Sequence, residues 1–341
     1  MLSGCCAGAA GDVKLKLRQN CRVVDCGGMN SPRMNFPVAC IYFALAMLGR
    51  LPLRWLQRLA KVVALAVRRL NTREAKVAAA NLWLGMPQLS TDARERLRRE
   101  CLWHTASTAL ETAAVWTQPT AHSLRLIREV DGGELLDAAE ASGRGVIVAA
   151  PHIGNWELFS VYLANRRPLA VVYRPPERAS LEPLLLKARA HPGVEPLRAE
   201  PAVVRRMLAL LRSGGTLGIL PDQRPKAGEG LYAPLFGVPA LTMTLLPRLA
   251  QKTGAVVVFG FAERLSDAQG FRIRLLPAPA ELLDPDPVRS ASALNVGIET
   301  CVALAPAQYQ WAYKRYPSRD AAGHARYSGH VDQQGPSAPH E

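Results

Sequence analysis

From residue 145 onward the chain alternates short apolar runs with longer stretches of helical periodicity, and this alternation limits the possible folds more than any other feature. The predicted strands are 146–150, 169–173, 194–197, 216–220 and 255–261, and the predicted helices are 157–165, 181–190, 202–212 and 242–252. A strand followed by a helix and another strand favours parallel pairing, with helices packed on the sheet. The sequence therefore predicts an α/β fold with a mainly parallel central sheet flanked by helices.

The ends of the chain differ in character from its centre. The first 33 residues lack apolar periodicity, and Met29 or Met34 could be the true start, while the final segment is rich in His, Gly, Ser and Gln. Such segments order poorly unless other contacts hold them. The predicted organisation is a dispensable or disordered stretch at 1–33, a membrane-anchoring helical segment at 34–71, an α/β domain at 72–316 with a helical preface at 72–140, and a disordered tail at 317–341.

An excess of cations predicts an acidic partner. The chain has 42 Lys plus Arg against 28 Asp plus Glu, a formal net charge of +14, which suits nucleic acid, anionic lipid or an acidic carrier protein. When 52–70 is projected as a helix, one narrow side gathers the basic residues of this region: Arg50, Arg54, Arg58, Lys61, Arg68 and Arg69. An apolar helix with a basic stripe is typical of the membrane interface, although a core helix with one solvated face shows the same pattern.

The uncharged apolar stretch 36–49 favours the membrane interpretation. It is shorter than the ~20 residues that a perpendicular span needs. A short span, a shallow hairpin with the following helix and a monotopic anchor all remain open.

His152 and Glu157 are the strongest candidates for catalysis. They follow a buried strand, and Asn155 is a good N-cap for a helix that begins at Trp156. His152 is then expected in a loop at the carboxyl end of the strand, where open α/β sheets commonly bind ligands. An imidazole oriented by a carboxylate can take a proton from an attacking hydroxyl, so we expect His152 to be the base and Glu157 to orient it.

Polar residues also follow two other predicted strands. Arg174 comes after 169–173, and Asp222 and Gln223 come after 216–220, so all three are expected on the same edge of the sheet as His152. A guanidinium there can bind phosphate or carboxylate, and the Asp and Gln side chains can hydrogen-bond a sugar or the attacking hydroxyl. Each of them alone is also compatible with a surface arginine or a turn before proline.

Four blocks in this order resemble the bacterial lipid A biosynthesis acyltransferases, which belong to the lysophospholipid acyltransferase-like superfamily. The blocks are Pro-His-Ile-Gly-Asn-Trp-Glu at 151–157, Tyr-Arg-Pro at 173–175, Pro-Asp-Gln at 221–223 and Ala-Pro-Leu-Phe-Gly-Val-Pro-Ala-Leu-Thr at 233–242. The likeness runs from about 36 to 316 and includes Asn81 and Gln308-Tyr309-Gln310-Trp311. The Glu-Gly-Thr of the glycerol-phosphate acyltransferases is missing after Pro221, which argues against a glycerophosphate acceptor.

The resemblance implies transfer of a fatty acyl chain from acyl carrier protein to a hydroxyl of a lipid A precursor, without a cofactor. The reaction is expected at the cytoplasmic face of the bacterial inner membrane, on anionic lipid, with the protein peripheral or held by one short anchor. Beside the base and its partner, the expected substrate-binding residues are Arg174, Asp222, Gln223, Gly237, Pro239 and Asn155, with Gly237 and Pro239 in a loop that helps to shape the acyl pocket.

Several alternative functions are weighed against this one. A serine hydrolase lacks its Gly-x-Ser-x-Gly element, the histidines show no His-Glu-x-x-His spacing, and the seven cysteines form no Cys-x-x-Cys pair, so no metal is expected. No nucleic-acid-binding signature accompanies the positive charge, so nucleic acid is not an expected partner. The remaining alternatives are another acceptor, such as a glycolipid, ornithine lipid or lysophospholipid, and a non-catalytic basic lipid-binding membrane protein.

Overall fold

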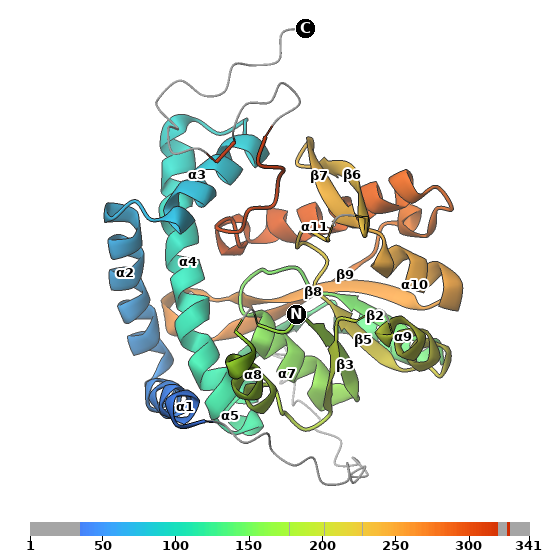
Figure 1. The fold of residues 1–341 in the computed structure, drawn as a ribbon, viewed down its shortest axis with the longest axis horizontal. Helices are drawn as coiled ribbons and strands as arrows, with labels where there is room; N and C mark the ends of the chain where they lie inside the picture. Colours follow the sequence, from blue (N-terminus) through green and yellow to red (C-terminus); the bar gives the residue numbers. More distant parts are fainter. Residues whose placement is uncertain (1–34, 177, 201, 227, 320–325, 328–341) are drawn as a thin grey trace, which may run out of the picture. The chain divides into compact units, whose positions relative to one another are not determined.

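A seven-stranded sheet in the order β1-β9-β8-β2-β5-β3-β4 forms the centre of the molecule (Figure 1). The computed structural model describes residues 35–176, 178–200, 202–226, 228–319 and 326–327, so the predictions for 1–33 and for most of the tail lie outside it. The strands of this sheet are β1 (Ile127–Asp131), β2 (Val146–Ala149), β3 (Leu169–Tyr173), β4 (Val194–Arg198), β5 (Thr216–Ile219), β8 (Val256–Arg264) and β9 (Phe271–Pro277). Neighbouring strands pair in parallel except β8 with β9, which confirms the predicted mainly parallel sheet.

Both faces of the sheet are covered, as the uninterrupted apolar composition of its central strands requires. Along β2, Ile147 and Ala149 pack into one core and Val146 and Val148 into the other, because successive side chains of a strand point to opposite faces. The helices are α1 (Phe36–Leu48), α2 (Leu53–Arg69), α3 (Arg73–Gly85), α4 (Thr91–Thr117), α5 (Thr120–Arg125), α6 (Gly133–Ala141), α7 (Trp156–Arg166), α8 (Glu182–Ala188), α9 (Val203–Arg212), α10 (Leu245–Thr253) and α11 (Pro287–Leu304). Helices α6 and α7 supply one core, and α9, α10 and α11 supply the other.

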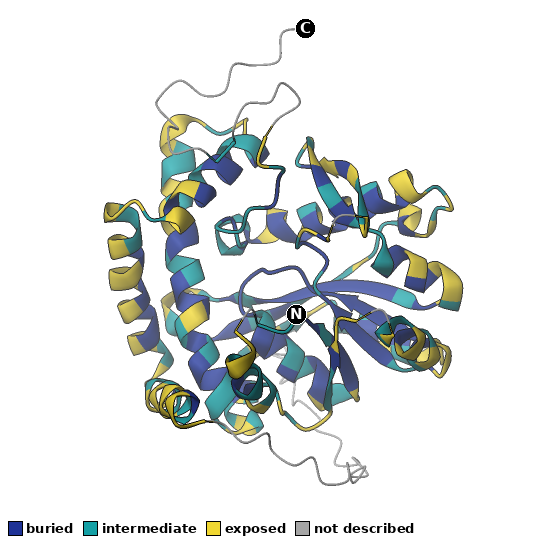
Figure 2. Ribbon diagram, viewed as in Figure 1, coloured by how far each residue is buried: buried dark blue, intermediate teal, exposed yellow. Residues whose placement is uncertain are grey.

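Helices α1 and α2 leave much of their apolar surface exposed. Helix α2 buries Leu56, Ala60 and Ala64 and lies along α4, whereas Trp55 is 49% exposed and Val62 is 64% exposed. In Figure 2 the outward sides of both helices are coloured as exposed. Within the described part of the chain, no single helix has the length and hydropathy of a membrane span; α1 and α2 meet that criterion only as a pair, bent by 114°.

Strands β1 and β9, the hairpin at 230–243 and the start of α10 depart from the sequence prediction. Strand β1 lies inside the region predicted to be a helical preface, and it pairs with β9, which was also not predicted. The segment expected to be a loop is an antiparallel hairpin of β6 (Gly230–Leu235) and β7 (Val238–Met243), and α10 begins at Leu245 rather than at Thr242. Short strands that pair at an edge or in a hairpin carry little apolar signal of their own, so tertiary pairing decides them.

The carboxyl-terminal segment packs against α3 through Asn81. The Asn81 amide donates to the carbonyls of Trp311 and Tyr313, both at 2.6 Å, and its oxygen accepts from the Tyr327 hydroxyl at 2.8 Å. Trp311 and Tyr316 are buried in the core. Tyr327, which belongs to the segment predicted to be a disordered tail, is therefore attached to the domain.

Candidate active site

The loop between β2 and α7, residues 151–155, carries His152 at the carboxyl end of the strand, as predicted. Asn155 caps α7, because its side-chain oxygen accepts from the amide of Leu158 at 3.0 Å. Gly154 has φ +60°, and a Cβ at this position would lie 1.9 Å from the carbonyl oxygen of Ala262 on β8. Glycine is required here by both its backbone conformation and the close approach of β8.

Asp222 holds the ring of His152. Its Oδ1 lies 2.7 Å from Nδ1 of the ring, and its Oδ2 accepts from the backbone amide of His152 at 2.9 Å. Both residues are buried. Burial alone would raise the pKa of Asp222, but the adjacent imidazole and the hydrogen bonds from His152 lower it below its usual value, so this carboxyl is ionised at neutral pH.

An ionised Asp222 fixes which nitrogen of His152 carries the proton. With Nδ1–H donating to the carboxylate, the neutral ring presents the lone pair of Nε2. The side-chain nitrogen of Gln223 lies 3.2 Å from that Nε2 and is the group that donates to it. The ring also packs edge-on against Trp156, with the centroids 4.9 Å apart. The site therefore holds an oriented imidazole whose Nε2 accepts from an amide.

The predicted pairing of His152 with Glu157 is wrong in this structure, because both ring nitrogens of His152 have other partners. Glu157 accepts from Nε of Arg189 at 3.1 Å and forms an ion pair with the same guanidinium, and Nε1 of Trp116 donates to it at 3.1 Å. Burial would raise the pKa of Glu157, but the charge and hydrogen bonds of Arg189, together with Trp116, lower it. Glu157 lies in the first turn of α7, where it faces α8 and α4 instead of the loop.

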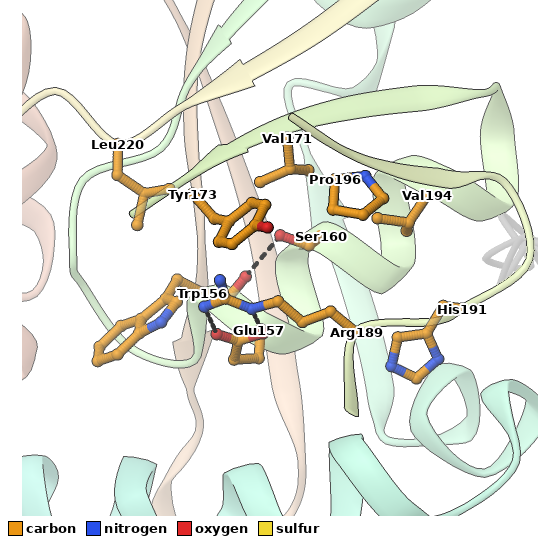
Figure 3. A pocket seen from close by; sticks show the side chains of 10 residues that line it. All are labelled: Trp156, Glu157, Ser160, Val171, Tyr173, Arg189, His191, Val194, Pro196 and Leu220. Atoms are coloured by element: carbon orange, nitrogen blue, oxygen red, sulfur yellow. Dashed lines mark hydrogen bonds and ion pairs between the residues drawn. The ribbon is translucent and has the colours of Figure 1, made fainter. Parts of the chain in front are cut away.

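A pocket adjoins this ion pair on the side of β3, β4 and α8. Figure 3 shows the Glu157–Arg189 pair at its centre, between Trp156 and His191. The wall opposite the ion pair is largely apolar and consists of Val171, Val194, Pro196 and Leu220 together with the ring of Tyr173. Trp156 links the two regions, because it lines the pocket and also packs against His152.

The other predicted site residues divide into three groups. Asp222 and Gln223 lie beside His152, as their positions after β5 implied. Arg174 is exposed just beyond the end of β3. Gly237 and Pro239 belong to the β6–β7 hairpin, where Phe236 packs against Trp311.

Asn155 does not fit its predicted role in substrate binding. It is fully buried, its oxygen caps α7, and its amide donates to Glu111 at 3.4 Å. In this structure both polar ends of the Asn155 side chain are used by other parts of the protein.

Sequence reasoning missed the contact of Asp222 with His152, and it missed Arg189 and Trp116 altogether. The signal for Asp222 was its place after β5, which is the neighbour of β2 in the sheet. Strand order is set by tertiary pairing, so the sequence did not indicate which of the polar strand ends lies next to His152. Nothing local in the helix that carries Arg189 distinguishes it from a surface arginine.

Comparison with known proteins agrees with the residue blocks that the site brings together. The family model described as bacterial lipid A biosynthesis acyltransferase matches residues 31–318. The chain is 26% identical over 295 residues to the lipid A biosynthesis lauroyltransferase of Escherichia coli, covering 86% of this chain and 90% of that protein. It is also 26% identical over 264 residues to the palmitoleoyltransferase of the same organism, covering 75% and 82% respectively.

A more distant match has a different name. The chain is 28% identical over 151 residues to the phosphatidylinositol mannoside acyltransferase of Mycobacterium tuberculosis, covering 42% of this chain and 48% of that protein. The family match, in contrast, spans most of the chain, including the His152 loop, Asp222 and the carboxyl-terminal segment held by Asn81. The chain thus belongs to the bacterial lipid A biosynthesis acyltransferase family and is an acyltransferase.

Proposed function

We propose that this protein transfers a fatty acyl chain from the thioester of acyl carrier protein to a hydroxyl of a lipid A precursor, with His152 as the base. The observation that carries the proposal is the His152–Asp222 pair, because an ionised carboxylate at Nδ1 leaves Nε2 ready to accept a proton. The lipid A acceptor follows the names of the relatives that match most of the chain.

The proposed reaction needs no covalent intermediate on the enzyme. The acceptor oxygen attacks the thioester carbonyl while its proton passes to Nε2 of His152, and the tetrahedral intermediate then collapses with loss of the carrier's thiolate. The imidazolium returns the proton to that sulfur. Asp222 stabilises the imidazolium. The acceptor hydroxyl replaces the Gln223 amide at Nε2, and the amide, which lies 3.2 Å from Nε2 in this structure, can then donate to the acceptor or to the developing oxyanion. A thioester already has a good leaving group, so an oriented base is sufficient.

We assign the apolar wall of the pocket beside Trp156, formed by Val171, Val194, Pro196 and Leu220, to contact with the acyl donor, because this wall lies next to the ring that packs against His152. The Glu157–Arg189 pair and His191 form the polar part of the same pocket. Arg174 is exposed at the end of β3, on the edge of the sheet where the strand that precedes His152 also ends. We assign Arg174 to the phosphates of the acceptor or the donor, because a guanidinium binds them through paired hydrogen bonds.

Helices α1 and α2 are proposed to hold the enzyme on the cytoplasmic face of the inner membrane. The exposed side of α2 carries apolar residues, including Trp55 and Val62, beside the basic residues Arg54, Arg58 and Lys61. Apolar side chains can enter the lipid while the cations contact anionic headgroups. This arrangement favours an interfacial helix over a core helix, since a core helix would bury Trp55 and Val62.

Reconstitution tests the reaction directly. Wild-type protein, acyl carrier protein loaded with a fatty acyl group, and a lipid A precursor should give a product one acyl chain heavier by mass spectrometry. His152→Ala should abolish this product while expression and membrane association stay unchanged. Asp137→Asn, which alters an exposed pair with Arg166, is the matched control and should retain activity. Full activity in His152→Ala would exclude His152 as the essential base.

The acceptor is tested in cells. Lipid A from a bacterial strain that lacks this protein should be missing one secondary acyl chain, and the mass difference identifies the chain. An unchanged lipid A profile together with a changed glycolipid or ornithine lipid would replace the proposed acceptor while leaving the acyl-transfer chemistry intact.

Membrane binding has its own test. Val62→Glu should abolish co-sedimentation with vesicles that contain anionic lipid, because it places a charge in the surface that faces the lipid. Val296→Glu on α11 is the control, since Val296 is 48% exposed but lies outside α1 and α2. Equal loss of binding in both variants would exclude α2 as the contact surface.

A further inference from the structure

A buried ion pair lies directly beneath the loop that carries His152. The side chain of Arg264, the last residue of β8, has no exposed surface, and its guanidinium donates to both oxygens of Glu111 on α4, at 2.8 and 2.5 Å. It also donates to Oγ1 of Thr108 at 2.8 Å and contacts Nδ1 of His104 at 2.9 Å. Burial and the neighbouring Arg264 lower the pKa of His104 to about 3, so that ring is neutral and accepts through Nδ1.

This network reaches the loop at two positions. The Thr108 hydroxyl donates to the backbone carbonyl of Gly154 at 2.8 Å, and the side-chain amide of Asn155 donates to Glu111 at 3.4 Å. Glu111 also accepts from Gln57 on α2 at 3.0 Å. The Glu111 carboxylate therefore connects three elements. They are α2, which carries the exposed apolar surface, the long helix α4, and Asn155 at the N-cap of α7.

The loop depends on such external partners for its shape. Its backbone forms neither helix nor strand, and apart from the amide of Ile153, which donates to the carbonyl of Pro151 within the loop, its hydrogen bonds go to other parts of the chain. The amide of His152 donates to Asp222, its carbonyl accepts from Gln310 at 3.0 Å, and the amide of Gly154 donates to the carbonyl of Gln308 at 3.1 Å. The Gly154 carbonyl is the group that Thr108 holds. A shift of the loop by a fraction of an ångström would move the His152 ring relative to Asp222 and Gln223.

Stability alone is a weak reason for such a pair. Taking two charges out of water costs free energy that their attraction barely offsets, and apolar replacements of buried pairs are often neutral. What the ion pair supplies here is fixed geometry, because a guanidinium that makes hydrogen bonds to Glu111, Thr108 and His104 has a single orientation.

We propose that Arg264, Glu111 and Thr108 are positioning residues that fix the backbone of loop 151–155 and thereby the location of the His152 ring. This inference rests on the assignment of His152 as the base. It predicts that loosening the Thr108 contact lowers the rate of the chemical step while substrate binding stays nearly unchanged, because none of the three residues is proposed to touch the substrate.

Thr108→Val is the decisive variant, because it removes the hydroxyl, keeps the shape and leaves the Arg264–Glu111 pair in place. We expect kcat to fall about tenfold or more with KM changed less than about twofold, since small misplacements of a catalytic group are costly. Hydrogen exchange of the backbone amides in 152–155 should become faster. Thr108→Ser restores the hydroxyl and should restore both kcat and slow exchange.

Ser290→Ala is the matched control. Ser290 is a buried hydroxyl on α11 that donates to the carbonyl of Leu282 at 2.9 Å, so its loss also removes one buried side-chain-to-backbone bond. Thr108→Val should lose more thermal stability than Ser290→Ala, because it also removes the acceptor for an N–H of Arg264, but only Thr108→Val should lose kcat. Equal kcat values in the two variants would overturn the positioning role. If His152→Ala itself remains active, the proposed base is wrong, and that result is separate from the comparison of Thr108 with Ser290.

Discussion

Asp222 and Glu157 are two buried carboxylates near the loop 151–155. They have similar surroundings, but one is paired with an imidazole and the other with a guanidinium. Both have a pKa below its usual value and both accept several hydrogen bonds. Asp222 contacts an imidazole that can gain and lose a proton, whereas Glu157 contacts the guanidinium of Arg189, which is always charged. A carboxylate paired with a titratable ring can stabilise the imidazolium that forms during the reaction, but one paired with arginine only holds structure and charge.

This difference assigns the two residues separate tasks. In the proposed mechanism Asp222 orients His152 and stabilises its protonated form, while Glu157 holds Arg189 at the pocket. The spacing of His152 and Glu157 in the sequence suggests a pair, yet the fold separates them and supplies Asp222 from another strand. The following predictions test this division, from the largest expected effect to the smallest.

Asp222→Asn should lower kcat for acyl transfer by about 10²–10⁴-fold, because the ring loses both its orientation and the charge that stabilises its protonated form. Steady-state rates with acylated carrier protein measure the effect. Asp137→Asn is the control for loss of a carboxylate at the surface. A decrease in kcat of less than about threefold would contradict the role of Asp222, because it corresponds to less free energy than a shift of one pKa unit.

Glu157→Gln should lower the free energy of unfolding by about 1–2 kcal/mol and the rate by about tenfold, because Arg189 is left without its counter-charge. Removing one partner of a fully buried pair costs more free energy of unfolding. Because Arg189 is 27% exposed, solvent screens part of its uncompensated charge and reduces that cost. Urea unfolding and steady-state rates give the two values.

The double variant Glu157→Gln/Arg189→Gln should recover part of the stability, since neither charge is then left alone. Glu140→Gln is the control for an arginine that keeps a second counter-charge, because Arg166 is as exposed as Arg189 but pairs with both Glu140 and Asp137. If Glu157→Gln instead lowers kcat as much as Asp222→Asn does, with unfolding unchanged, the two carboxylates share the catalytic task and the division fails.

Acid should destabilise the wild type more than either carboxylate variant. Both carboxyls have a lower pKa when folded than when unfolded, so the stability they provide is complete above about pH 4 and is lost as the pH falls through the folded-state values. Between pH 5 and pH 3 the wild type should lose about 1 kcal/mol more than Asp222→Asn or Glu157→Gln, as measured by urea unfolding.

His104 supplies an internal reference for that measurement. Its pKa of about 3 means that the unfolded chain binds a proton there below about pH 6.5 while the folded chain does not. His104 therefore also lowers the free energy of unfolding as the pH falls, and this contribution is common to the wild type and both variants. Identical pH profiles for all three proteins would show that neither carboxylate titrates as described.

Trp156→Phe should have the smallest effect, a reduction in rate of about threefold or less, because a smaller ring keeps most of the aromatic contact with His152. Trp156→Ala should cost more, since it removes the side chain that both lines the pocket and packs against His152. If Trp156→Phe changes the preferred acyl chain length without changing the rate, the pocket beside it binds the donor as proposed.

Much of the fold was predictable because its signals are local. The apolar runs before Pro151 and Pro221 predicted β2 and β5, and Asn155 marked the start of α7, since an N-cap acts within a few residues. Strand β9 was missed although Phe271, Ile273 and Leu275 alternate with Arg272 and Arg274, a local strand signal. Strand β1 was missed because its stability comes from pairing with β9 at the edge of the sheet. The β6–β7 hairpin was taken for a loop for the same reason.

The sequence by itself determined that His152 stands in a loop after a buried strand, because apolar composition, Pro151 and the Asn155 cap all act over a few residues. Only the tertiary structure decided the partners. The strand order β2-β5 brings Asp222 to His152, and α8 brings Arg189 to Glu157. Contacts between residues tens of positions apart depend on how whole strands and helices pack, and a single sequence does not record that packing in its local pattern.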